Sequence, residues 1–84
     1  MQPNVPTTAI QQQILKFFQQ NSHAVETARG IALWLGVEPK FVQEALEGLV
    51  ERGWLLTHKT DAIVGYALTT DEKILNYIRG QGLA

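Results

Sequence analysis

The apolar residues in the middle of the chain recur with helical spacing on both sides of a short turn, Leu35-Gly36-Val37. Before the turn they are Ala28, Ile31, Ala32 and Leu35, and after it they are Val42, Ala45, Leu46, Leu49 and Val50. This spacing predicts two amphipathic helices, over 27–35 and 39–52, whose apolar faces share one core. Gly36 suits the left-handed backbone that ends a helix, and Pro39 suits a first turn, where its missing N–H is not needed.

A further helix is predicted before this pair, over 8–20. Thr8 and Gln11 have the spacing of a capping box. The apolar positions of this helix again share one face: Ile10, Ile14, Phe17 and Phe18. The glutamines at 11–13 are expected to lie partly on the solvent face, without a functional role. Val25, just before the next helix, predicts either a very short strand or a hydrophobic staple.

The periodicity changes after the third predicted helix. The runs 54–58 and 63–68 are rich in β-prone residues and are separated by polar residues, which is typical of a β-hairpin. Thr69 and Glu72 repeat the capping-box spacing and begin a closing helix that ends near Gly80. The predicted fold is therefore mainly α with a small β-hairpin (α+β), in the order helix-helix-helix-strand-strand-helix.

The length of 84 residues allows one domain. We assign it to residues 8–79, where the periodic elements lie. Residues 1–7 contain two prolines and no periodicity and are expected to form a flexible N-terminal arm, while residues 80–84 are expected to fray.

Charged residues make up only 18% of the chain, below the ~25% of typical domains, and hydrophobic residues make up 45%. This excess predicts that part of the apolar surface is covered in a homodimer, which we expect to form through the first and last helices. Phe17, Tyr77 and Leu83, near the chain ends, motivate this expectation. Leu33 and Trp34 lie away from the core face, so either another part of this chain covers them or they contact a second chain.

The residue types exclude several kinds of chemistry. Without cysteine, the chain has no thiolate nucleophile, disulfide or cysteine zinc site, and His23 and His58 are too far apart to form a local metal pair. A nucleophile beside a base, paired carboxylates and a glycine-rich phosphate loop are all missing, so we predict a protein that is not an enzyme and uses no cofactor. No signal peptide or apolar run near ~20 residues is found, which predicts a cytoplasmic protein.

Small, apolar and glycine positions recur through the central helices and the second strand of the hairpin. They lie in the segments Ile31-Ala32, Leu35-Gly36-Val37, Val42, Ala45-Leu46, Leu49-Val50-Glu51-Arg52-Gly53-Trp54 and Tyr66-Ala67-Leu68-Thr69. Together with the order of elements, this string resembles the winged helix-turn-helix domain of small bacterial and archaeal transcription regulators. The resemblance covers residues 8–79. It implies a homodimeric regulator that binds double-stranded DNA, with helix 39–52 in the major groove and the wing, 57–62, on the backbone.

The resemblance also implies which side chains contact DNA. They are Lys40, Gln43, Glu44 and Glu47 on the recognition helix, Thr27 and Arg29 at the N-terminus of the preceding helix, and His58, Lys59 and Thr60 on the wing. Gln43 is expected to pair with adenine, and a glutamate with the amino group of cytosine. Lys40 and Arg29 are expected to contact phosphates.

The charge of the chain differs from that of most DNA-binding domains, which carry a basic patch. The net charge is −1, and the segment from Glu26 to Arg52 has three basic residues against five glutamates. This acidity favours an alternative function, a winged-helix protein–protein interaction module without DNA binding, which uses the same fold or the Leu33 and Trp34 surface.

Overall fold

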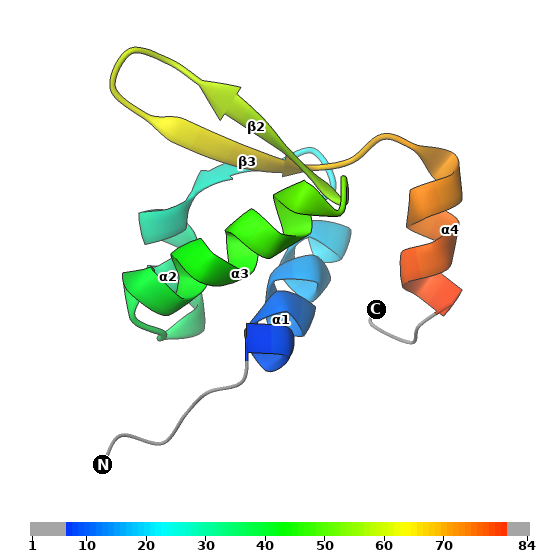
Figure 1. The fold of residues 1–84 in the computed structure, drawn as a ribbon, viewed down its shortest axis with the longest axis horizontal. Coiled ribbons are helices and arrows are strands. Elements are labelled where there is room, and N and C mark those ends of the chain that lie inside the picture. Colours follow the sequence, from blue (N-terminus) through cyan, green and yellow to red (C-terminus); the bar gives the residue numbers. More distant parts are fainter. Residues whose placement is uncertain (1–6, 81–84) are drawn as a thin grey trace.

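Three helices form a bundle with an antiparallel sheet on one side, and a fourth helix closes the chain (Figure 1). The structure is a computed structural model and describes residues 7–80. Its elements are α1 Thr7–Gln20, β1 Val25–Thr27, α2 Ala28–Leu35, α3 Pro39–Glu51, β2 Leu55–Lys59, β3 Val64–Leu68 and α4 Glu72–Gly80. Thr7 and Gly80 are helical, and the rest of the predicted arm and tail, with Leu83, lies outside the described residues. The predicted α+β fold is confirmed.

Strand β3 is the centre of the sheet, whose order is β1-β3-β2. The predicted hairpin is formed by β2 and β3, with Leu55 opposite Leu68. On its other edge β3 pairs with β1, with Val25 opposite Ala67, so Val25 belongs to a strand. A Cβ at Gly65 would lie 2.7 Å from Val25 Cγ1, so β1 can approach β3 this closely because position 65 is glycine.

The core forms where the predicted apolar faces of the helices meet the inner face of the sheet. Its buried hydrophobic residues are Ile10, Ile14, Leu15, Phe17, Phe18, Ile31, Ala32, Val42, Ala45, Leu46, Leu49, Leu55, Tyr66, Leu68 and Ile78. The spacing that predicted the two central helices is confirmed, because α2 and α3 turn these positions toward α1. Each large apolar side chain buried here contributes about 1.5–3 kcal/mol, which fixes the outer face of α3 relative to the sheet.

Two left-handed glycines set the direction in which the chain leaves α2 and α3. Gly36 has φ 69°, and its N–H donates to the carbonyl of Ala32. Gly53 has φ 77°, and Trp54 N–H donates to the carbonyl of Leu49 at 3.0 Å. This pattern ends a helix and satisfies its last carbonyls, so the chain turns sharply from α2 to α3 and from α3 to β2.

The predicted capping boxes are wrong. Gln11 does not cap α1, because its amide is buried and donates to the carbonyl of Ala45 at 3.3 Å. A Cβ at Gly48 would lie 2.6 Å from Gln11 Nε2, so this glycine makes room for the amide between the two helices. At α4 the cap is Asp71, whose Oδ1 accepts from Lys73 N–H at 2.9 Å. Both errors arose because spacing alone cannot identify which polar side chain reaches the backbone.

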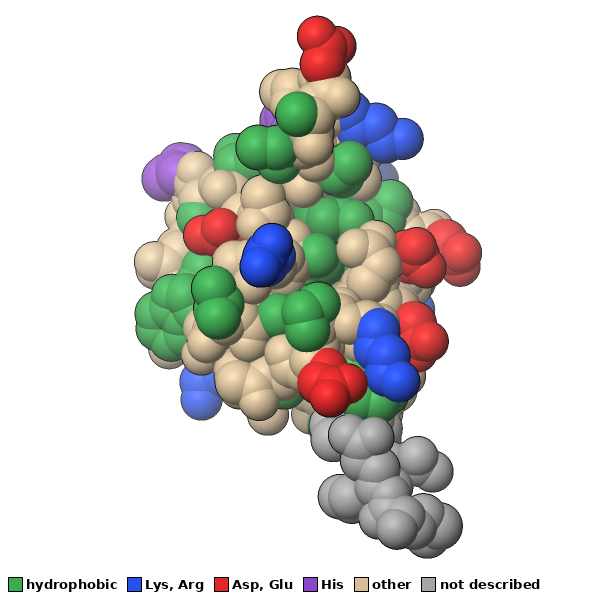
Figure 2. Space-filling model, turned by 90° about the vertical axis from the view of Figure 1, so that its left-hand side faces the viewer, with side chains coloured by type: hydrophobic (Ala, Val, Ile, Leu, Met, Phe, Trp, Pro, Cys, Tyr) green, Lys and Arg blue, Asp and Glu red, His purple; other side chains and the backbone are tan. Residues whose placement is uncertain are grey.

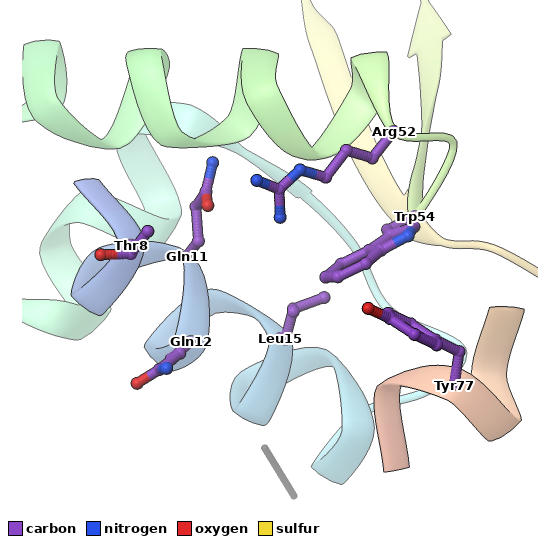
Figure 3. Close-up of a pocket in the computed structure, with 7 residues that line it drawn as sticks. All are labelled: Thr8, Gln11, Gln12, Leu15, Arg52, Trp54 and Tyr77. Atoms are coloured by element: carbon purple, nitrogen blue, oxygen red, sulfur yellow. The ribbon is translucent and has the colours of Figure 1, made fainter. Parts of the chain in front are cut away.

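Helix α4 lies to one side of the three-helix bundle, at the right of Figure 1, and contacts the turn that follows α3. Ile78 is fully buried, while the ring of Tyr77 lies beside that of Trp54 with centroids 5.7 Å apart. The guanidinium of Arg52 lies over the other ring of this pair, 5.2 Å from the centroid of Trp54. Figure 3 shows Arg52, Trp54 and Tyr77 around a cleft between α1, the end of α3 and α4, which Gln11 also lines.

Candidate nucleic-acid interface

The solvent face of α3 lies opposite the core and beside the hairpin, and it is acidic. Lys40, Glu44, Glu47 and Glu51 are all exposed there, so this face carries three carboxylates and one ammonium group. The Lys40 ammonium lies 5.0 Å from the centre of the Phe41 ring. The sequence prediction that Lys40, Glu44 and Glu47 are exposed agrees with this structure, and the helix presents mostly hydrogen-bond acceptors to a ligand.

Gln43 is half-buried at the border between α3 and the sheet. Its Nε2 donates to the hydroxyl of Tyr66 at 3.0 Å and to Oε2 of Glu47 at 3.4 Å. Tyr66 lies on the central strand and is only 5% exposed. Gln43, which is expected to contact a base directly, therefore also joins the recognition helix to the central strand of the sheet.

The tip of the wing is held by its own backbone and side chains. Thr60 N–H donates to the carbonyl of Ile63 at 2.9 Å, and Ile63 N–H donates to Thr60 Oγ1 at 3.3 Å. His58, Lys59 and Thr60 are all exposed, as predicted. Lys59 also lines a groove between α3 and the hairpin, together with Gln43, Glu47, Val50, Glu51, Thr57, Val64 and Tyr66. Its charge therefore lies among carboxylates.

The N-terminus of α2 already has an anionic group beside it. Thr27 caps the helix, because its Oγ1 accepts from Gly30 N–H at 3.0 Å. The carboxylate of Glu26 accepts from the N–H of Thr27 at 3.2 Å, and a Cβ at Gly30 would overlap it. A carboxylate at this position complements the helix dipole and takes the place where a phosphate would bind. Arg29 is exposed beside it.

The apolar residues predicted for protein contact differ widely in exposure. Leu33 is 81% exposed, Trp34 67% and Tyr77 55%. Phe17 is only 8% exposed, because Trp34 packs edge-on against it with ring centroids 5.4 Å apart. Within residues 7–80, α1 thus contacts one edge of the Trp34 ring and leaves most of it accessible. Phe17 has little surface left for a partner.

Charges of both signs are scattered over the face that contains α2 and the wing. Figure 2 shows Lys and Arg side chains standing apart, with Asp and Glu side chains between them. A continuous basic band does not appear on this face. A nucleic acid would therefore experience little long-range attraction here, and its binding would depend on short-range contacts.

Sequence reasoning missed two residues of this region. Tyr66 is part of the string that carries the family resemblance but is not among the predicted site residues, yet its hydroxyl contacts Gln43. Glu26 was counted only as a charge, yet its carboxylate lies at the first turn of α2. The alternation of β3 could have indicated that Tyr66 points inward, but no local pattern identifies its partner on a distant helix.

The fold and this region define a class. A bundle whose second and third helices are joined by a tight turn, with a β-hairpin beside the third, is a winged helix-turn-helix domain, and this chain has that fold.

Similar solved structures include those of ZitR from Lactococcus lactis. One ZitR mutant matches with a TM-score of 0.69 at 24% sequence identity, over 98% of this chain and 55% of that chain. Another ZitR structure, described as a zinc-responsive MarR family member, has a TM-score of 0.67 at 26% identity and covers 96% of this chain and 55% of that one. This chain thus spans about half the length of ZitR. No protein-family model matches the sequence, and no curated protein matches it.

Between residues 7 and 80, no group of three or more His, Cys, Asp and Glu side chains is placed to hold a metal ion, and the chain has no cysteine. None of the helices in this part of the chain is long and apolar enough to cross a membrane.

Proposed function

We propose that this protein is a sequence-specific DNA-binding transcription regulator that acts through α3 and the wing. The observation that carries the proposal is the placement of the outer face of α3: it is exposed, with the hairpin beside it, as a helix that enters a major groove must be. The likeness in fold to ZitR, a MarR family member, supports this function.

In this proposal α3 lies in the major groove and residues 57–62 of the wing lie along the backbone. Lys40, Lys59 and Arg29 contact phosphates, while Gln43 and the glutamates of α3 face the base edges. Because few positive charges approach the backbone, nonspecific binding is weak. Occupancy of the operator by this protein then blocks or tunes transcription in the cytoplasm.

The proposed regulator is a homodimer, since two recognition helices are needed to contact enough base pairs. We place the dimer contact on α1 and α4, where Tyr77 is exposed beside the cleft of Figure 3. Light scattering at tens of micromolar protein tests it: a dimer mass supports the proposal, and a monomer mass contradicts it.

Fluorescence anisotropy with labelled duplexes tests DNA binding itself. Selection from a randomised duplex pool should enrich a palindromic sequence, and a duplex of that sequence should bind ~10³-fold or more tightly than a scrambled duplex at physiological salt. Lys40→Ala should weaken binding to both the selected and the scrambled duplex. Lys73→Ala, on α4, is the control. Equal binding to selected and scrambled duplexes would contradict sequence-specific regulation.

A second function, a protein interaction module, is supported by one observation: Leu33 and Trp34 remain 81% and 67% exposed on α2. Large apolar side chains that remain exposed are typical of protein contact sites. Affinity capture with the wild type and Trp34→Ala, followed by mass spectrometry, tests this function. A partner lost only in the variant, together with an absence of DNA binding, would favour the module.

A further inference from the structure

The amide of Gln43 is the only polar group that links α3 to the central strand among the side-chain hydrogen bonds of residues 7–80. Its partner, the Tyr66 hydroxyl, belongs to a side chain that is 5% exposed and sits under α3. The register places Tyr66 between Glu26 of β1 and Thr57 of β2. The backbone of Tyr66 is therefore paired on both sides within the sheet, and its hydroxyl is a well-placed acceptor for the Gln43 amide.

The orientation of this amide follows from the chemistry of its second partner. A carboxylate only accepts hydrogen bonds, so the group that faces Glu47 at 3.4 Å must be the nitrogen of Gln43. The same nitrogen donates to Tyr66 at 3.0 Å. Both amide hydrogens are thus used within the protein. The carbonyl oxygen, which accepts no hydrogen bond from residues 7–80, is the group left for a ligand.

The other side chains on the solvent face of α3 also present hydrogen-bond acceptors. Glu44 and Glu47 are exposed and offer carboxylate oxygens, so together with the Gln43 carbonyl they form a surface of acceptors. In the major groove the matching donors are the N4 amino group of cytosine and the N6 amino group of adenine. Guanine O6 and N7 and thymine O4 are acceptors and would face like groups across the contact.

We propose that Tyr66, together with Glu47, positions the amide of Gln43 and so sets the base preference of this recognition helix. Glu47 determines that the nitrogen faces inward, because a carboxylate only accepts hydrogen bonds, and Tyr66 is the second acceptor that holds the nitrogen there. The remaining carbonyl makes α3 prefer adenine or cytosine on the strand that Gln43 faces, and the two-hydrogen-bond pairing of glutamine with adenine is prevented. That pairing requires both the nitrogen and the oxygen of the amide to face the base. The inference rests on the proposed DNA-binding function and specifies what the helix recognises.

The test compares two substitutions that each remove one hydroxyl group. Tyr66→Phe removes the hydroxyl that accepts from the Gln43 amide, and Ser22→Ala removes the hydroxyl of an exposed serine in the turn after α1. Each purified protein selects duplexes from a pool randomised at its central positions, and the enriched duplexes are then varied one base pair at a time in anisotropy titrations. Thermal melts confirm that both variants fold.

The wild type and Ser22→Ala should prefer cytosine or adenine over guanine and thymine at one contacted position, with adenine and cytosine nearly equal. In Tyr66→Phe the freed amide can pair with adenine through two hydrogen bonds, so adenine should gain about fivefold over cytosine at that position. Gln43→Glu, which keeps only acceptors, should retain the wild-type ranking, and Gln43→Ala should lose it.

The outcomes separate this inference from the function on which it rests. If neither the wild type nor any variant binds a duplex, the DNA-binding function is wrong and the inference fails with it. If the wild type binds a selected duplex but Tyr66→Phe keeps the same ranking of bases, the proposed DNA-binding function stands and the proposed role of Tyr66 is overturned. A wild-type preference for guanine at every contacted position would also overturn it, whether or not Tyr66→Phe folds.

Discussion

The buried face and the solvent face of α3 differ in the kind of side chain that they carry. On the buried face, Val42, Ala45, Leu46 and Leu49 are all 0% exposed, and each fills a position that the sequence pattern assigned to the core. On the solvent face, three glutamates and one lysine replace the basic residues expected of a DNA-binding helix. The buried face is part of the core of the fold, which this chain shares with ZitR at 24% identity. The solvent face, which packing does not constrain, carries what is particular to this protein.

The largest effect should come from the buried face. Leu46→Ala leaves a cavity in the centre of the core and should lower the free energy of unfolding by about 2–5 kcal/mol. Glu44→Ala, on the opposite side of the same helix, should change it by less than ~0.5 kcal/mol. Urea unfolding followed by circular dichroism measures both. Equal destabilisation by the two substitutions would mean that the faces are not independent.

A smaller effect is expected from the charges of the solvent face. Replacing Glu44 and Glu47 together by glutamine removes two repulsions of phosphates and should raise nonspecific affinity about tenfold at low salt. The salt dependence should become steeper, because more counterions are released. Anisotropy against a random-sequence duplex at several salt concentrations provides the measurement. Glu72→Gln on α4 is the control, and an unchanged affinity in the double variant would place DNA elsewhere.

The wing should contribute one phosphate contact. Lys59→Ala should weaken nonspecific binding and reduce the slope of log K against log salt by up to ~1. Lys73→Ala, an equally exposed lysine on α4, should leave the slope unchanged. The same salt titration distinguishes them. Should both lysines have the same effect, the attraction is a property of the total charge and not of the wing.

The smallest effect concerns the N-terminus of α2. Glu26→Gln removes the carboxylate that lies at the first turn of α2 and should let a phosphate approach Thr27 and Gly30, raising affinity by about two- to fivefold. Stability should fall slightly, by about 0.3–1 kcal/mol, because the helix dipole loses a complementary charge. Binding and unfolding are measured on one preparation. A gain in affinity without a loss of stability would mean that the carboxylate does not interact with the helix.

Most of the fold could be predicted because its signals are local. The 3.6-residue spacing of the core positions and the placement of Gly36 and Pro39 were sufficient for α2, α3 and the turn between them. The capping of α4 was misassigned to Thr69 although Asp71 lies two residues away, because both side chains can accept from a nearby N–H.

The candidate site was predicted less completely, because its contacts join distant parts of the chain. Exposure of Lys40, Glu44 and Lys59 followed from helical and hairpin spacing. The hydrogen bond between Gln43 and Tyr66 did not, since it depends on how β3 lies under α3. The exposed state of Trp34 was left open for the same reason: whether α1 covers a ring depends on packing and not on the sequence around it.

The central place of β3 in the sheet also constrains the order in which the protein can fold during synthesis. Helices α1, α2 and α3 leave the ribosome before β2 and β3 and can associate through contacts close in sequence. Val25 must wait for Ala67, half a chain length later, before its strand has a partner. Until β3 emerges, β1 and β2 both remain unpaired edges. The nascent chain can therefore form its helical bundle before its hairpin, in which Tyr66 contacts Gln43.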